Sequence, residues 1–172
     1  TGIGTKKAVV VRTPDSLRLL AKTKHVFLDK TVTLTDGKLA IIKATGLSGV
    51  SAEAMLEKAS AVAVTSKHPV SKAIAATPHD LVATDVIEVA GNGLTGQVDS
   101  VMVSVEKPGS YQNQAELDEA LEHAGPNTLV VVAWDNVARG LIELSDKPRP
   151  TSKQAMDELK PAAFSSSIAC LE

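Results

Sequence analysis

Residues 25–35 read His-Val-Phe-Leu-Asp-Lys-Thr-Val-Thr-Leu-Thr, and this stretch decides the fold. The apolar run 25–28 predicts a buried strand that ends abruptly at Asp29. Since α/β sheets bind ligands at the carboxyl ends of their strands, Asp29 is a candidate nucleophile toward a phosphoryl group. The hydroxyls and backbone amides after it could hold the transferred oxygens, and Mg²⁺ would neutralise their charge. An ordinary polar turn after a strand has the same local pattern, so the residues alone leave both interpretations open.

The two ends of the chain predict an α/β unit. Residues 8–12 form an apolar strand, and a helix over 13–22 begins with the signals Thr13, Pro14 and Asp15. Near the other end, a capping box of Thr151 and Gln154 predicts a helix to about residue 160, and the tail 164–167 is expected to fray.

The middle of the chain predicts an α+β domain with an antiparallel sheet, because its strands are joined by short turns. A turn at Asp36-Gly37 precedes a strand over 39–44, and a capping box of Asn113 and Glu116 opens a helix that ends at Gly125. Met102 and Val103 are expected in the core. The other elements are helices 51–64 and 69–76, strand 82–89, and hairpins 94–98/101–105 and 128–134/139–144.

Composition excludes several classes of protein. The chain has 172 residues, 44% of them hydrophobic, and a formal net charge of −2, which favours a globular domain over a nucleic-acid-binding one. One cysteine, Cys170, excludes an internal disulfide and a cysteine metal cluster. No apolar run is long enough for a transmembrane helix, and no initiator Met is present, so we expect a soluble piece of something longer.

Four motifs in order resemble those of P-type ATPases of the heavy-metal-transporting subfamily. Residues 29–35 match six of the seven positions of the phosphorylation motif Asp-Lys-Thr-Gly-Thr-Leu-Thr. Ser66-Lys67-His68-Pro69 resembles the Ser-Glu-His-Pro signature, and Gly91-Asn92-Gly93 resembles the Gly-x-Gly nucleotide loop. Residues 146–150 resemble the hinge that returns to the phosphorylation domain, so the resemblance covers at least residues 8–159.

The resemblance implies a domain organisation and a set of site residues. A nucleotide-binding domain at 36–145, with a twisted antiparallel sheet flanked by helices, would be inserted into an incomplete α/β haloacid-dehalogenase-like phosphorylation domain at 1–35 and 146–172. The implied ligands are ATP and Mg²⁺. By the resemblance, the catalytic residues are Asp29, Lys30, Thr31 and Thr33, Mg²⁺ is held by Asp29 and Thr31, and the nucleotide is bound by His68, Gly91 and Gly93.

The glycine loop has a second possible interpretation that the residues after it exclude. Gly91 to Gly96 spells a literal Gly-x-Gly-x-x-Gly, which in dinucleotide-binding folds leads straight into a helix. Here the residues that follow predict a strand and a turn, so we reject a dinucleotide site. His25, His79 and His123 are scattered without other ligands at suitable spacing, so no metal site beyond Mg²⁺ is expected.

The sequence departs from the family pattern at four places. Val32 stands where the family has Gly, Ala63 where it has a Glu in contact with adenine, and Lys67 where the signature has Glu. The family's Gly-Asn pair near residues 103–105 is not found. A degenerate, non-catalytic relative therefore stays open as an alternative. So does a haloacid-dehalogenase-type phosphatase, although such enzymes place an Asp two residues after the nucleophile, where this chain has Thr31.

The family's later Thr-Gly-Asp and Gly-Asp-Gly-x-Asn-Asp segments do not occur in the chain. We therefore expect that it cannot complete phosphoryl transfer alone, and whether it is itself an enzyme stays open. Its parent would be a membrane-embedded pump with this region on the cytoplasmic side. Its partners would be ATP and the pump's membrane and actuator domains, with no nucleic acid, and the isolated chain would be a monomer. The transported ion cannot be inferred, since its ligands would lie elsewhere.

Overall fold

The computed structural model describes residues 13–23, 25–29, 33–159 and 165–167. The described part of the chain divides into two compact units. The first is Thr1–Asp36 together with Pro148–Glu172, and the second is Gly37–Lys147. The strand predicted over 8–12 lies outside the described residues.

An antiparallel sheet forms the centre of Gly37–Lys147. Within the described residues, six strands lie in the order β2-β7-β6-β5-β4-β3, so each strand from β3 to β7 pairs with its neighbour in the sequence. Short turns account for the pairing of β3 with β4, β4 with β5 and β6 with β7, whereas the segment that joins β5 to β6 contains a helix. The strands are β2 (Thr35–Gly46), β3 (Ala83–Val89), β4 (Gly93–Val98), β5 (Val101–Glu106), β6 (Thr128–Trp134) and β7 (Val137–Pro148).

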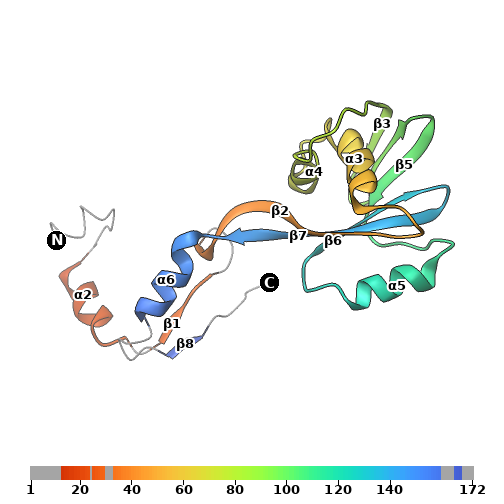
Figure 1. Cartoon of the computed structure of the whole chain (residues 1–172). Coiled ribbons are helices and arrows are strands. Elements are labelled where there is room, and N and C mark those ends of the chain that lie inside the picture. Colours follow the sequence, from red (N-terminus) through yellow and green to blue (C-terminus); the bar gives the residue numbers. More distant parts are fainter. Residues whose placement is uncertain (1–12, 24, 30–32, 160–164, 168–172) are drawn as a thin grey trace. The chain divides into compact units, whose positions relative to one another are not determined.

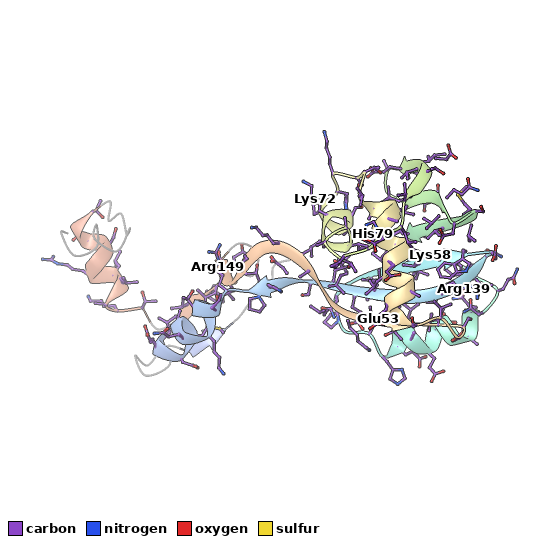
Figure 2. The ribbon with its side chains drawn as sticks, turned by 45° about the horizontal axis from the view of Figure 1, so that its top comes forward. Glu53, Lys58, Lys72, His79, Arg139 and Arg149 are labelled. Atoms are coloured by element: carbon purple, nitrogen blue, oxygen red, sulfur yellow. The ribbon has the colours of Figure 1, made fainter. Side chains whose placement is uncertain are left out.

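Two hairpin turns adopt the conformation that their residues favour. Asp99 and Ser100 have φ of 49° and 65°, and Asp135 and Asn136 have φ of 56° and 59°. Two consecutive left-handed residues match the right-handed twist of the flanking strands, and Asp and Asn tolerate this backbone better than most residues. Lys58 of the helix α3 (Ala52–Ala63), labelled in Figure 2, reaches the first of these turns. Its Nζ lies 3.0 Å from Asp99 Oδ2.

Helices cover both faces of this sheet (Figure 1). On one face, α3 (Ala52–Ala63) and α4 (Pro69–Ile74) bury a core with β4, β5, β6 and β7. On the other, α5 (Gln114–Glu122) packs over β6 and β7 through Leu117. Because α5 covers only that part of the sheet, Ile87 and Met102 on the same face remain 60% and 56% exposed. The prediction that Met102 is a core residue is therefore wrong.

The Asp36-Gly37 turn and the Asn113–Glu116 capping box are not formed as predicted. β2 runs from Thr35 without interruption, since Lys38 N donates to Asp146 Oδ1 at 2.9 Å and holds that end of β2 beside β7. Asn113 does precede α5, but its side chain caps no backbone amide of the helix. Instead its Nδ2 donates to Ala138 O at 2.8 Å and its Oδ1 accepts from Ala138 N at 2.9 Å.

The first unit contains the described elements α2 (Pro14–Leu20), β1 (His25–Phe27), α6 (Pro150–Leu159) and β8 (Ser165–Ser167). β1 pairs with β8 in parallel, so part of the tail that was expected to fray is a strand. Thr151 lies inside α6 instead of capping it, because Pro150 already occupies its first position. Arg149 anchors the start of this helix through N–H to Leu34 O at 2.8 Å and Nε to Thr35 O at 2.9 Å.

Candidate functional site

A pocket of about 400 Å³ lies within Gly37–Lys147, at one end of strands β3, β4, β5 and β6 and beside the start of α4. It brings together three residues that the sequence predicted for one site, His68, Gly91 and Gly93. Its volume lies in the range of small-molecule sites. The complete lining is His68, Val70, Ser71, Glu88, Val89, Ala90, Gly91, Asn92, Gly93, Leu94, Val105, Glu106, Lys107, Thr128, Leu129 and Val130.

His68 is the N-cap of α4, and this role determines which ring nitrogen can serve a ligand. The backbone N–H of Val70 donates to His68 Nδ1 at 3.3 Å. Because Nδ1 is the acceptor, the neutral ring carries its proton on Nε2. The side chain is exposed at the pocket, so its Nε2–H is available as a hydrogen-bond donor.

Gly91 and Gly93 are required for different reasons. Gly91 has φ of 80°, and a Cβ built on it would have no atom within 4 Å, so the backbone here is open to a ligand. Gly93 has φ of 153°, and its Cβ would collide with Val105 O and lie 2.7 Å from Glu106 Cα. Gly93 therefore lets β4 and β5 pair closely, whereas Gly91 leaves free space in the pocket.

Three charged residues of the pocket were not predicted. Glu88 on β3 accepts a hydrogen bond from Ser66 Oγ at 3.1 Å. Glu106 accepts hydrogen bonds from Tyr111 Oη at 2.9 Å and from Ser104 Oγ at 3.0 Å. The pKa of Tyr111 is raised, mainly because the side chain is buried and also because it donates to the Glu106 carboxylate. Lys107 follows at the end of β5. The sequence feature that could have pointed to Glu88 is its position: it is a charged residue in the strand directly before the glycine loop.

Much of the remaining wall is aliphatic. Leu94, Val105 and Val130 are each at least 94% buried and line the pocket. An apolar surface beside a few polar groups suits a flat ring system with hydrogen-bonding edges. Ala63, where the family pattern has a Glu, is completely buried in the core and does not line the pocket.

Asp29 belongs to the other unit, two residues beyond the end of β1, and its side chain is exposed. Thr33 is exposed as well. The predicted site residues Lys30 and Thr31, and Val32 between Asp29 and Thr33, lie outside the described residues. In the described part of the chain, no three His, Cys, Asp or Glu side chains gather as metal ligands. No helix there has the length and apolar character needed to cross a membrane.

Comparison with known proteins places these features in a family. A probable copper-transporting ATPase from Synechococcus sp. is 30% identical over 93% of this chain and 21% of its own length. A probable cobalt/nickel-exporting P-type ATPase from Mycolicibacterium smegmatis is 33% identical over 90% of this chain and 25% of its length. A zinc-transporting PIB-type ATPase structure superposes with a TM-score of 0.75 at 29% identity, over 89% of this chain and 26% of that one.

The chain therefore spans about a fifth to a quarter of the length of these relatives. It resembles the catalytic nucleotide-binding and phosphorylation region of heavy-metal P-type ATPases, and its α+β fold is that of their catalytic domains. The model of the haloacid dehalogenase-like hydrolases matches residues 23–169. The chain belongs to the haloacid dehalogenase-like hydrolase family, and its homologues are heavy-metal P-type ATPases.

Proposed function

We propose that the pocket at His68 and Gly91 binds ATP, and that the chain is the ATP-binding cytoplasmic region of a heavy-metal P-type ATPase. The observation that carries this proposal is that His68 and the glycine loop of Gly91 and Gly93, two separate motifs of the sequence, line one pocket. The heavy-metal P-type ATPases to which the chain is similar support the choice of nucleotide.

The lining fits a nucleoside triphosphate. Leu94, Val105 and Val130 supply apolar surface for the base, and His68 supplies the Nε2–H donor for one of its acceptors. The open backbone at Gly91 permits a close approach, and Lys107 supplies a positive charge for phosphate oxygens. The pocket thus offers groups for both the base and the phosphates of the ligand.

The nucleotide would serve an aspartyl-phosphate cycle in the parent protein. The Asp29 carboxylate would attack the γ-phosphorus, the bond to the β-γ bridging oxygen would break, and ADP would leave. Lys30 would contact phosphate, and Thr33 would help to hold the transferred oxygens. Mg²⁺ binds few protein carboxylates together with phosphate oxygens, which suits the exposed Asp29 with the neighbouring Thr31, and it would neutralise charge there.

Residues 36–145 would then be the nucleotide-binding domain, and residues 1–35 with 146–172 would be parts of the phosphorylation domain. The other partners would be the membrane and actuator domains of the parent pump, whose activity is metal-ion transport. The isolated chain would bind ATP as a soluble monomer.

Titration calorimetry with ATP on His68→Asn tests the proposal. Asn is also a good N-cap, so this variant keeps α4 intact while removing the imidazole Nε2–H. We expect ATP affinity to fall about fivefold or more, the value of one hydrogen bond to a ligand. His123→Asn, at an exposed histidine that follows α5, is the matched control and should bind ATP like the unchanged chain.

The unchanged chain also decides between the alternatives. Absence of binding to ATP, ADP and GTP would refute the proposal and favour the degenerate relative. Phosphate release from a simple phosphomonoester would favour the phosphatase. Equal ATP affinity in His68→Asn and the unchanged chain would remove His68 from the site.

A further inference from the structure

Glu88 presents a carboxylate to the pocket from β3. It pairs with Leu94 of β4, and paired residues of adjacent strands project to the same face of a sheet. Leu94 is buried in the core under α3 and α4, so Glu88 projects toward these helices. Its neighbours Ile87 and Val89 project to the other face and are exposed. The pleat of β3 therefore turns Glu88, like the partly buried Val86, toward the face of the sheet that α3 and α4 cover, and Glu88 is the one of the two that lines the pocket.

A single hydroxyl fixes Glu88 relative to His68. Ser66 Oγ donates to Glu88 Oε1 at 3.1 Å and accepts the backbone N–H of His68 at 3.1 Å. Ser66 is 7% exposed, so the hydroxyl at the centre of this link is buried, whereas Glu88 and His68 are themselves exposed at the pocket. Glu88 and His68 thus lie on the two sides of one buried serine, and both line the pocket.

The two side chains offer opposite hydrogen-bonding groups. An ionised carboxylate only accepts, and Ser66 uses one of its several acceptor positions. His68 donates through Nε2–H, because Nδ1 accepts from Val70. The second carboxylate that lines the pocket, Glu106, is already bonded to Tyr111 and Ser104. This arrangement matches a base edge that carries a donor beside an acceptor.

We propose that Glu88 determines base specificity by accepting a hydrogen bond from the exocyclic amino group of a 6-aminopurine, while His68 donates to a ring nitrogen of the same base. This assignment rests on the proposed ATP-binding function. A 6-oxopurine carries a carbonyl oxygen where adenine carries its amino group. That oxygen would face the carboxylate as a second acceptor, so a contact that favours adenine disfavours hypoxanthine.

The test compares ATP with ITP, which carry the same phosphates and sugar and differ only in the base. We expect the unchanged chain to bind ATP at least about fivefold more tightly than ITP in titration calorimetry. In Glu88→Gln the side-chain amide can donate to the 6-oxo group, and its oxygen can still accept from Ser66. The preference for ATP over ITP should then fall to about one or reverse, with circular dichroism unchanged.

The ratio of affinities separates base recognition from charge. Removing the Glu88 carboxylate lowers its repulsion of the phosphates equally for ATP and ITP. This effect therefore cancels in the ratio of the two affinities. Glu122→Gln makes the same change at an exposed position of α5, away from the pocket, and should keep the ratio of the unchanged chain. Glu88→Ala should also reduce the ratio, because it removes both the hydrogen bond to the amino group of ATP and the unfavourable contact with the 6-oxo group of ITP.

Two results would overturn the assignment. If Glu88→Gln and Glu88→Ala both retain the full preference for ATP, Glu88 does not contact the amino group, although the pocket remains an ATP site. If the unchanged chain binds ATP and ITP equally, the pocket does not read the 6-position, and nucleotide binding still stands. Failure of both nucleotides to bind overturns the proposed function together with the assignment.

Discussion

At the scale of single residues, the two glycines of the loop show how one motif can serve two purposes. Gly93 is needed because it pairs with Glu106 of the neighbouring strand β5, and a Cβ would meet the backbone of Val105 and Glu106. A Cβ added at Gly91 would have no atom within 4 Å, and the φ of 80° at this residue is a left-handed turn conformation. The motif alone suggested nucleotide contact for both residues, and only the packing of β4 against β5 separates their roles.

Substitution of the two glycines should therefore have different consequences. Gly93→Ala is expected to lower the free energy of unfolding by about 1–3 kcal/mol, since backbone must shift to admit the methyl group. In Gly91→Asn, the asparagine can adopt the left-handed backbone, and its side chain fills open space in the pocket. This variant should therefore keep nearly the same stability but bind ATP several-fold more weakly. Denaturant unfolding and titration calorimetry measure the two effects. Loss of stability in Gly91→Asn with unchanged ATP affinity would contradict this division.

At the scale of elements, a cluster of polar side chains fastens α5 to the sheet. Ser48, just beyond β2, donates its N–H to Glu116 Oε1 at 2.6 Å and its Oγ to Oε2 at 2.7 Å. Asn113 donates to the same carboxylate at 3.0 Å and to Ala138 O in β7. The spacing of Asn113 and Glu116 predicted a local helix cap, whereas the two residues join α5 to β7 and to the turn that follows β2.

The pH dependence of stability should report this cluster. The backbone N–H of Ser48, then Asn113 and the Ser48 hydroxyl, lower the pKa of Glu116 from its ordinary value of 4.5. A carboxylate with a lowered folded pKa contributes stability above its unfolded pKa and loses it as pH falls through the folded pKa. Glu116→Gln should therefore be less stable than the unchanged chain at neutral pH, and the difference should shrink in acid.

Chemical denaturation at a series of pH values measures this difference. Glu119→Gln, an exposed position on the same helix, is the control and should show little difference at any pH. A destabilisation by Glu116→Gln that is the same at neutral and acidic pH would show that the carboxylate charge has no part in fastening α5.

At the scale of the whole molecule, the second unit contains everything that the proposed binding needs. Both hydrophobic core clusters and every residue that lines the pocket lie within Gly37–Lys147. Asp29 and the candidate phosphoryl-transfer residues lie in the first unit. The proposed nucleotide site and the candidate acceptor carboxylate of Asp29 thus lie in separate parts of the chain, as expected for an inserted domain.

A fragment of residues 37–147 should therefore fold and bind ATP by itself. We expect a single cooperative unfolding transition and an ATP affinity within about twofold of the full chain, because its cores and pocket remain complete. Thermal unfolding followed by circular dichroism and titration calorimetry test the two parts of this prediction. A fragment that is folded yet binds ATP much more weakly would show that the first unit contributes to the site.

The sequence by itself determined the fold class and most elements of this protein. The turns at Asp99-Ser100 and Asp135-Asn136, and the cap at Ser51, are local signals, and local backbone preferences decide them. The motifs around Asp29, His68 and Gly91 likewise indicated the family, because motif residues are contiguous in the chain. The whole course of β2 and the pairing of β1 with β8 escaped prediction, since each depends on a partner more than 100 residues away.

Only the tertiary structure decided which residues share the pocket and how each one faces it. Glu88 enters the site because the pleat of β3 and a buried hydroxyl on Ser66 orient it, and neither is visible in the order of residues. Met102 is exposed because α5 covers only one part of its face of the sheet. These features arise from contacts between distant segments, whose free energy appears only when the chain is folded.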